Sequence, residues 1–415
     1  MLRGFLGLGV FVLVGFLLSE NKKAVRWKLI GGGVILQFLT AMALLKLPYI
    51  KEFFFLLNKL VLMIEKATLD GSAFMFGYLG GGKLPYTEIQ NGNSFIMAFR
   101  VLPIVLVMSA LAAVLFHWSI LQRIVKILSK VLQKTLGISG VQGLGVGANV
   151  FLGIVEAPLF IRPYLASMTH CSLFTVMTAG MATVAGTVMV LYASILRNVL
   201  PDAIGHILIA SLISAPAAVL IAHLMVPETE DPEKDSHLAT EIETESAMDA
   251  LIKGAMDGIQ LILSIVAMII VLFSVVSLLN QFLFFLPEIN GKVITLEYLV
   301  SFIFYPVVWL MGIPLEECAV ASNLMATKTV LNEFVSYQKM GQLVNNELSM
   351  NSRIIMTYAM CGFANLASLG LIVGSFGTII PERRSEVVSL GFRSVIAGTL
   401  ATCMTGAIVS ILIKI

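Results

Sequence analysis

Long runs of apolar residues alternate with short polar stretches along most of this 415-residue chain. A helix needs about 20 mostly apolar residues to cross a bilayer. Continuous runs also differ from the alternating pattern of a membrane β-barrel. The pattern therefore predicts an all-α polytopic membrane protein with about eight transmembrane helices. The apolar segments lie at 2–18, 29–47, 95–117, 172–198, 203–226, 253–284, 352–379 and 387–414.

Composition agrees with this fold class. Hydrophobic residues make up 58% of the chain and charged residues only 13%, whereas soluble domains carry about 25% charged residues. The excess apolar surface must face the lipid bilayer. A net charge of +2 gives no reason to expect a nucleic-acid partner. The four cysteines are scattered through apolar segments without metal-ligand or disulfide spacing, so neither a metal cofactor nor a disulfide framework is expected.

Basic clusters suggest how the chain is oriented. Segment 2–18 resembles a signal peptide, but no small-residue cleavage site follows it, and the basic residues come after the apolar run. It is therefore interpreted as a retained first span. Cytoplasmic loops are enriched in Lys and Arg. If the clusters at 22–28, 123–134 and 383–384 all face the cytoplasm, both termini lie outside it.

Several stretches are too short, too interrupted or too polar for simple spans. Apolar but broken runs lie at 119–134, 139–167, 298–313 and 315–338. Residues 51–66 mix charges at helical spacing, which predicts an interfacial helix on the outer side. Residues 227–247 are acidic and rich in turn formers, and we interpret them as a solvated linker.

Two parts of the chain, 119–226 and 298–414, share one order of elements. Each has an amphipathic piece, a hairpin-like piece with an acid, and two spans. The first span of each pair carries a small-residue segment, at 180–186 and 362–368, which predicts an unwound point. With the orientation above, the two copies would be inverted, an arrangement that places substrate and ion sites near the membrane midplane. Close helix packing is the alternative reason for such small residues.

The two hairpin acids, Glu156 and Glu333, are the leading candidates for function. Glu156 is the only acid between Glu88 and Asp202. A charged residue at membrane depth costs about 2.5–3.5 kcal/mol on insertion scales, so such residues are usually functional. No Ser-His-Asp grouping and no paired-His motif is visible, so an enzyme is not expected.

The neighbouring polar residues suggest two kinds of ligand. Glu333, Asn365 and Ser368 would suit a vicinal diol such as a ribose, because charge-assisted hydrogen bonds to a carboxylate are strong. Asn149 and Thr183 offer neutral oxygens that suit Na⁺ as a coupling ion. The alternatives are a hairpin cap for Asn149 and a helix back-bond for Thr183.

The motifs at these positions resemble those of the concentrative nucleoside transporter family, over nearly the whole chain. The matching pieces are Phe99-Arg100-Val101-Leu102-Pro103, Gly153-x-x-Glu156-Ala157-Pro158, Asn332-Glu333-Phe334-Val335, Cys361-Gly362-Phe363-Ala364-Asn365 and Ala397-Gly398-Thr399-Leu400. The resemblance implies a bacterial inner-membrane importer that takes up nucleosides with a sodium gradient. It also implies a homotrimer whose protomers have eight transmembrane helices, two re-entrant hairpins and interfacial helices.

The resemblance further implies an elevator mechanism, in which a transport domain moves against a scaffold. The scaffold would comprise 1–118 and the helix in 251–297, and the transport domain 119–226 and 298–415, with a cytoplasmic linker at 227–250. The substrate residues carried over from the family are Gly153, Ile154, Val155, Glu156, Val188, Glu333, Phe363, Asn365 and Ser368. Those carried over for sodium are Asn149, Leu152, Thr183 and Val184.

One departure from the family pattern bears on selectivity. Family members often have Gln-Thr or Gln-Ser directly before the first-hairpin glutamate, where this chain has Ile154 and Val155. Two side chains that could hydrogen-bond a base edge are thus aliphatic. The sequence predicts that ribose recognition is kept and base selectivity is altered. Proton coupling through Glu156 or Glu333, a passive channel and a membrane enzyme are the alternatives to sodium-coupled transport.

Overall fold

The computed structural model describes residues 2–87, 96–197, 199–200, 202–230, 244–287, 293–344 and 347–413. Within these ranges every regular element is helical, which confirms the predicted all-α class. Six helices are long and apolar enough to cross a membrane, and three further apolar helices are shorter. The helices are α1 Leu2–Leu17, α2 Trp27–Lys46, α3 Pro48–Phe76, α4 Met97–Arg100, α5 Pro103–His117, α6 Ile120–Leu136, α7 Gly140–Asn149, α8 Glu156–Phe160, α9 Arg162–Leu165, α10 His170–Ala182, α11 Gly186–Leu196, α12 Ala203–Met225, α13 Ala247–Leu283, α14 Leu296–Leu310, α15 Cys318–Val330, α16 Glu333–Gln342, α17 Met350–Met360, α18 Leu366–Ile379 and α19 Arg384–Ile413, with 3₁₀ turns at Gly77–Gly80, Leu315–Glu317 and Pro381–Arg383.

Many of these helices begin at a residue whose side chain caps them. A side-chain oxygen at such a position accepts a hydrogen bond from a backbone N–H of the first turn, which has no partner within the helix. Asn332 accepts from Val335 N at the start of α16, over 3.0 Å. Ser139, Thr169, Ser246, Thr295, Ser349 and Asn365 cap α7, α10, α13, α14, α17 and α18 in the same way.

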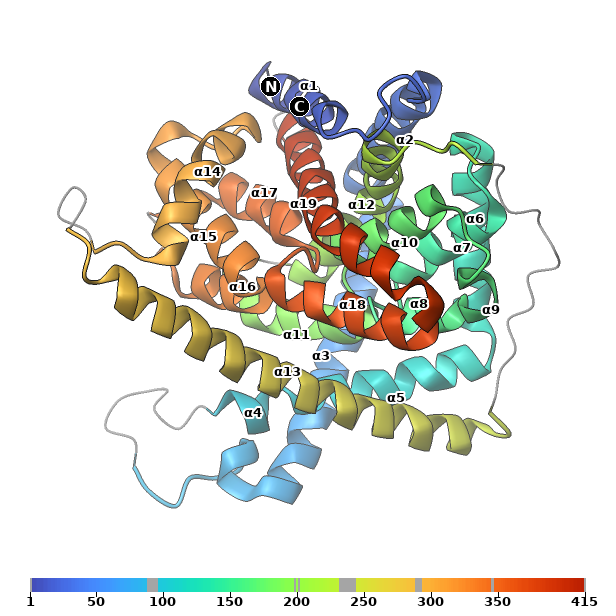
Figure 1. Ribbon diagram of the computed structural model, residues 1–415. Coiled ribbons are helices and arrows are strands. Elements are labelled where there is room, and N and C mark those ends of the chain that lie inside the picture. The colour runs from blue at the N-terminus through green and yellow to red at the C-terminus, as the bar shows by residue number, and fades with distance from the viewer. Residues whose placement is uncertain are drawn as a thin grey trace.

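Helices α10, α12, α17 and α19 pack together as the centre of the molecule (Figure 1). In the most apolar 18-residue stretch of α12, 89% of the residues are buried inside the protein. In the corresponding stretch of α13 only 6% are buried. A helix that is apolar all round is buried in a core or faces lipid. The central helices therefore form the protein core, and most of α13 is exposed on the surface of the protein.

Helix α13 packs on α5 below the central helices (Figure 1). Gly254 of α13 faces Ser109 and Ala113 of α5, and Gly258 faces Leu106. Small residues at these positions let the two backbones approach closely, as is common between membrane helices. The pair forms a unit distinct from the central helices.

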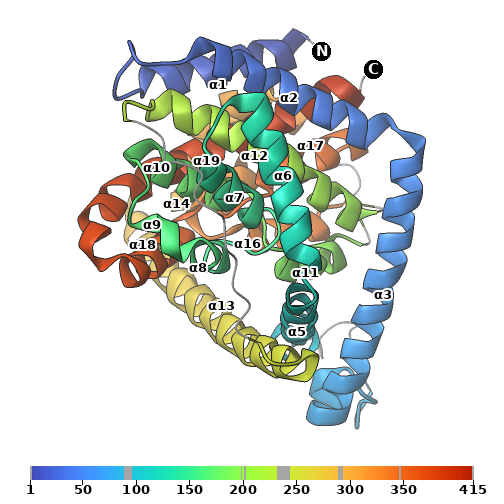
Figure 2. The ribbon, with the colours of Figure 1, turned by 90° about the vertical axis from the view of Figure 1, so that its right-hand side faces the viewer.

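The predicted interfacial segment 51–66 is the middle of α3, which extends further in both directions, from Pro48 to Phe76. It is not among the six candidate spans. Figures 1 and 2 show α3 running across the direction of α5, which does qualify as a span. The interfacial position of this segment remains a prediction.

Two segment boundaries differ from the sequence expectation. The first apolar segment forms α1, whose 16 residues reach only about 24 Å, less than the roughly 30 Å of a hydrocarbon core. Helix α13 begins at Ala247, inside the expected linker 227–250, because Ser246 caps it. Most of that linker, 231–243, lies outside the described residues. The N- and C-terminal ends lie next to each other, where Gly4 of α1 meets Ser410 of α19 (Figure 1).

Both predicted unwound points are present. Helix α10 ends at Ala182 and α11 begins at Gly186, while α17 ends at Met360 and α18 begins at Leu366. The expected hairpins are also pairs of packed helices, α7 with α8 and α15 with α16, interrupted at 150–155 and 331–332. The same order of interrupted helices thus occurs twice along the chain.

Candidate functional site

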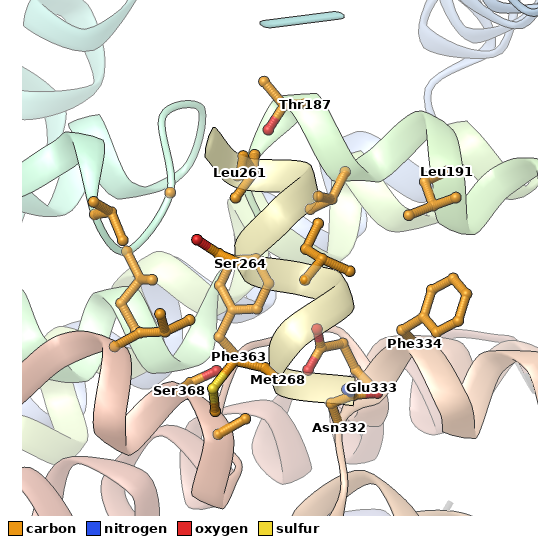
Figure 3. Close-up of a pocket in the computed structure, with 18 of the residues that line it drawn as sticks. Thr187, Leu191, Leu261, Ser264, Met268, Asn332, Glu333, Phe334, Phe363 and Ser368 are labelled. Atoms are coloured by element: carbon orange, nitrogen blue, oxygen red, sulfur yellow. The ribbon is translucent and has the colours of Figure 1, made fainter. Parts of the chain in front are cut away.

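A cavity of about 300 Å³ lies where the four interrupted regions meet. Binding pockets for small molecules begin at about this size. Figure 3 shows Glu333, Phe363 and Ser368 on one side of the cavity and Ser264 of α13 on another. The lining combines residues of both repeats with one face of α13.

The interruptions hold one another in place. Gly186 N, at the start of α11, donates to Phe151 O in the first hairpin over 2.8 Å. The second broken span crosses the first at Gly362, whose φ is +154°. A Cβ at Gly362 would lie 2.8 Å from Met181 O, so only glycine allows this close approach. The unwound backbone segments of the two repeats are therefore in direct contact.

Glu333 is the most firmly placed polar group of the cavity. Its side chain is almost fully buried, and Tyr192 Oη donates to Oε1 over 2.6 Å. Asn365 Nδ2 donates to Oε2 over 2.7 Å. The Oδ1 of Asn365 in turn accepts from Ser368 N over 2.7 Å, which caps α18. This chain of hydrogen bonds fixes the carboxylate and joins α11, α16 and α18.

Glu156 begins α8 and lines the same cavity. Gly153, three residues earlier, has φ +103°, and a Cβ there would lie 2.8 Å from Glu156 Oε2. Glycine thus supplies both the turn and the room for the carboxylate. Ile154 is buried and Val155 half-buried, so the residues before the acid present aliphatic surface to the cavity.

The structure brings together every residue that the sequence predicted for substrate. All nine line this single cavity: Gly153, Ile154, Val155, Glu156, Val188, Glu333, Phe363, Asn365 and Ser368. Their individual roles remain predictions, because a shared cavity does not show which group each one binds.

The residues predicted for sodium gather directly behind the first hairpin. Thr183 Oγ1 donates to Asn149 O over 3.0 Å and to Ala179 O over 2.8 Å. The second of these is the helix back-bond considered as an alternative role. Asn149 Nδ2 donates to Gly145 O and Val176 O, which leaves Oδ1 directed toward Gly180. Backbone at Leu152 and Val184 belongs to the same two interruptions, so hard oxygen donors are concentrated here.

Several residues of the site were missed from the sequence. Tyr192 lies one turn after Val188 on α11, a spacing that could have indicated a shared face. Lys328 of α15 lies outside the cavity lining but is fully buried, and its Nζ has no hydrogen-bond partner among the described residues. Ser211 of α12 bridges the two unwound regions, since its hydroxyl donates to Val150 O and accepts from Val184 N. A polar stripe of α13 was missed as well.

Comparison with known proteins agrees with this geometry. Family models match along the chain: "Na+ dependent nucleoside transporter N-terminus" at 6–79, "Nucleoside recognition" at 98–198 and "Na+ dependent nucleoside transporter C-terminus" at 206–410. An uncharacterized transporter, YutK of Bacillus subtilis, is 33% identical over the whole length of both chains. The chain belongs to the concentrative nucleoside transporter family. Its relatives are transporters rather than enzymes.

Animal and structural relatives extend the likeness within the concentrative nucleoside transporter family. Solute carrier family 28 member 3 of Eptatretus stoutii is 31% identical and matches 98% of this chain, which spans 60% of that longer protein. Sodium/nucleoside cotransporter 2 of Rattus norvegicus is 30% identical, with 98% and 62% covered. The inward-facing, substrate-bound structure of CNTnw has a TM-score of 0.89 at 31% identity, covering 99% of this chain and 98% of that one. An outward-facing, doubly substituted CNTnw has a TM-score of 0.91, covering 100% and 98%.

Proposed function

We propose that this member of the concentrative nucleoside transporter family imports nucleosides by coupling them to Na⁺. The observation that carries the proposal is the placement of Glu333 between Tyr192 and Asn365 in a cavity built from helix interruptions. A fixed carboxylate with neighbouring amide and hydroxyl groups suits a molecule with two adjacent hydroxyls. Such a buried polar site in an apolar membrane chain costs stability and is kept for function.

The cavity divides into a ribose end and a base end in this proposal. Glu333, Asn365 and Ser368 would accept and donate hydrogen bonds to the ribose hydroxyls. Glu156 would reach the base, while Ile154, Val155, Val188 and Phe363 pack against its faces. Ribose is common to all nucleosides, so the first end would set affinity and the second end selectivity.

Sodium would be held by oxygens at the two interruptions of the first repeat. The proposed ligands are the side chains of Asn149 and Thr183 with main-chain oxygens at Leu152 and Val184. These atoms suit Na⁺ because they are neutral, hard oxygen donors on backbone that is free of helical hydrogen bonds. Because these ligands lie next to the first hairpin, the closure of that hairpin over the substrate would depend on bound Na⁺.

An elevator movement is supported by the division of the molecule. Helices α5 and α13 form one unit through their glycine contact, and the interrupted helices pack around α12 and α19 as another. The cavity lies between the two units. Sliding of the second unit, 119–226 with 298–415, against a scaffold of 1–118 and 251–297 would carry the site across the membrane. Helices α1 and α2 of that scaffold pack on α12 and α19, so they would have to slide along these two helices. The bare face of α13 would then contact lipid and the other copies of a homotrimer.

The driving force is sufficient for accumulation. One cation gains about 2.3 kcal/mol for each 100 mV of membrane potential. A tenfold cation gradient adds about 1.4 kcal/mol. Together these terms support accumulation of several hundredfold for one Na⁺ per nucleoside. In a bacterial inner membrane with both termini outside, substrate and ion would move into the cytoplasm.

Uptake by purified protein in proteoliposomes tests the proposal. Radiolabelled uridine, cytidine, adenosine and inosine are offered with an inward Na⁺ gradient, or with Na⁺ replaced by choline at fixed pH. We expect unmodified nucleoside to accumulate above its equilibrium concentration when the Na⁺ gradient is present, and not when choline replaces Na⁺. Uptake that ignores Na⁺ and follows an imposed pH gradient would show proton coupling instead, and equilibration without accumulation would show a channel.

Thr183→Val provides the variant for the sodium site, with Thr402→Val as its matched control. Thr402 is also buried in a membrane helix, but among the described residues its hydroxyl bonds only to the backbone of its own helix, at Thr399 O. We expect Thr183→Val to raise the Na⁺ concentration for half-maximal uptake at least tenfold, and Thr402→Val to leave it unchanged. Equal responses of both variants would contradict the assignment of this site.

A further inference from the structure

Helix α13 places a stripe of polar side chains in the cavity. Asp257, Gln260 and Ser264 line it at spacings of three and four residues, so they share one face of the helix. Leu261 and Met268 continue that face, and Figure 3 shows them beside Ser264. The rest of α13 is so apolar that it is the most hydrophobic of the six candidate spans. Polar residues in such a helix are expensive and are expected to serve the cavity.

The stripe supplies hydrogen-bonding groups that the first hairpin lacks. Ile154 and Val155 cannot hydrogen-bond, so Glu156 is the only hydrogen-bonding side chain among the four hairpin residues 153–156. Asp257 and Glu156 line the same cavity, one from α13 and the other from the first hairpin. Gln260 lines the same cavity one turn further along α13, and its backbone carbonyl accepts from Ser264 Oγ over 2.8 Å, which leaves the Gln260 side chain out of this bond. Its side-chain amide can both donate and accept.

We propose that Asp257 and Gln260 of α13 recognise the edge of the nucleobase and select bases that carry an exocyclic amino group. The inference rests on the proposed nucleoside transport. A carboxylate only accepts hydrogen bonds, and an exocyclic amino group donates two. Acidic side chains pair with the amino group of cytosine, and glutamine pairs with the edge of adenine. A base with a carbonyl there would place an acceptor against the carboxylates of Glu156 and Asp257, which disfavours it.

Two pairs of nucleosides test recognition of the exocyclic amino group separately from the rest of the nucleoside. Cytidine and uridine differ by an amino group against a carbonyl on a pyrimidine, and adenosine and inosine differ in the same way on a purine. Ribose is identical in all four, so the ribose end of the cavity contributes equally. We expect the purified protein to bind cytidine at least tenfold more tightly than uridine, and adenosine at least tenfold more tightly than inosine, by calorimetry in the presence of Na⁺.

The variants are Asp257→Asn and Gln260→Leu, measured separately. Each should reduce the preference within both pairs to threefold or less, because it removes one of the groups that read the edge. The same substitutions elsewhere on α13, Asp249→Asn and Gln281→Leu, serve as matched controls. Both control residues are on α13 but outside the cavity, so the preferences should not change.

The outcomes separate the inference from the function on which it rests. Failure of the unmodified protein to bind any nucleoside overturns both. Tight binding with equal affinity within each pair overturns the inference alone. Preferences that survive in both Asp257→Asn and Gln260→Leu also overturn it, provided that these variants retain the melting temperature of the parent protein. A drop in preference confined to the two cavity variants supports it.

Discussion

Tyr192 donates a hydrogen bond to Glu333 Oε1 over 2.6 Å, joining residues 141 positions apart in the sequence. The tyrosine belongs to the broken span of the first repeat, and the glutamate begins the hairpin helix α16 of the second. One bond thus ties the two repeats together at the carboxylate proposed to bind ribose. A third side chain, Asn365, completes the arrangement from α18.

Tyr192→Phe should weaken the binding of every nucleoside by about tenfold or more. Hydrogen bonds to charged groups contribute about 1.5–3 kcal/mol, and 1.4 kcal/mol corresponds to a factor of ten. Calorimetry with a panel of nucleosides measures the change. Tyr337→Phe is the matched control, because the Tyr337 hydroxyl donates to Thr357 O rather than to Glu333. A loss that depends on the base would contradict the assignment of Glu333 to ribose.

Glu333→Gln and Glu156→Gln should differ in kind. Glu333→Gln should weaken the binding of all nucleosides to the same extent, by at least tenfold, because it alters the group that contacts the common ribose. Glu156→Gln should have effects that vary with the base, since it lies at the other end of the cavity beside Ile154 and Val155. Competition for uptake among uridine, cytidine, adenosine and inosine measures both patterns. Equal losses across all bases for both variants would refute the division.

Gly180→Ala should impair the sodium site while leaving the ribose end intact. A Cβ at Gly180 would lie 3.1 Å from Asn149 Oδ1 and 3.1 Å from Ile154, so the asparagine amide must shift. We expect the Na⁺ concentration for half-maximal uptake to rise several-fold, in a titration at saturating nucleoside. Gly370→Ala is the control, because a Cβ there meets nothing within 4 Å. An unchanged Na⁺ requirement in Gly180→Ala would argue against Asn149 as a ligand.

Gly362→Ala should reduce the stability of the folded protein. The position has φ +154°, and a Cβ would press on Met181 O at 2.8 Å, where the two unwound spans cross. Strain and overpacking of this kind each cost about 1–3 kcal/mol. A thermal melt in detergent should show a lower midpoint than for the unmodified protein. Gly374→Ala, which enters open space, should melt like the parent. Matching midpoints for the two variants would show that the crossing tolerates a side chain.

Much of the fold could be predicted because its causes are local. Apolar runs predict helices, and the small residues at 180–186 and 362–368 correctly marked the two unwound points. Asn365 caps the helix after the second unwound point, and Asn332 caps the helix after the second-hairpin interruption. Capping is a property of these side chains and their immediate neighbours. The first apolar segment was less well predicted, since α1 is shorter than a full span.

The motifs, and the family that they resemble, also indicated nine substrate residues, and all nine line the cavity. They did not predict Tyr192, whose partner is far away in sequence, or Asp257 and Gln260 of α13. Those two read as ordinary polar residues near the start of a long apolar helix. Their position follows from the packing of α13 on α5, which turns one face toward the cavity.

The sequence by itself determined the membrane class, the helical segments, their interruptions and the acids Glu156 and Glu333, because hydrophobicity and helix breaking act over a few residues. Only the tertiary structure decided how Glu333 is held and which helix completes the cavity. Those relationships depend on contacts between distant segments, and such contacts are set by how whole helices pack rather than by the pattern within any one of them.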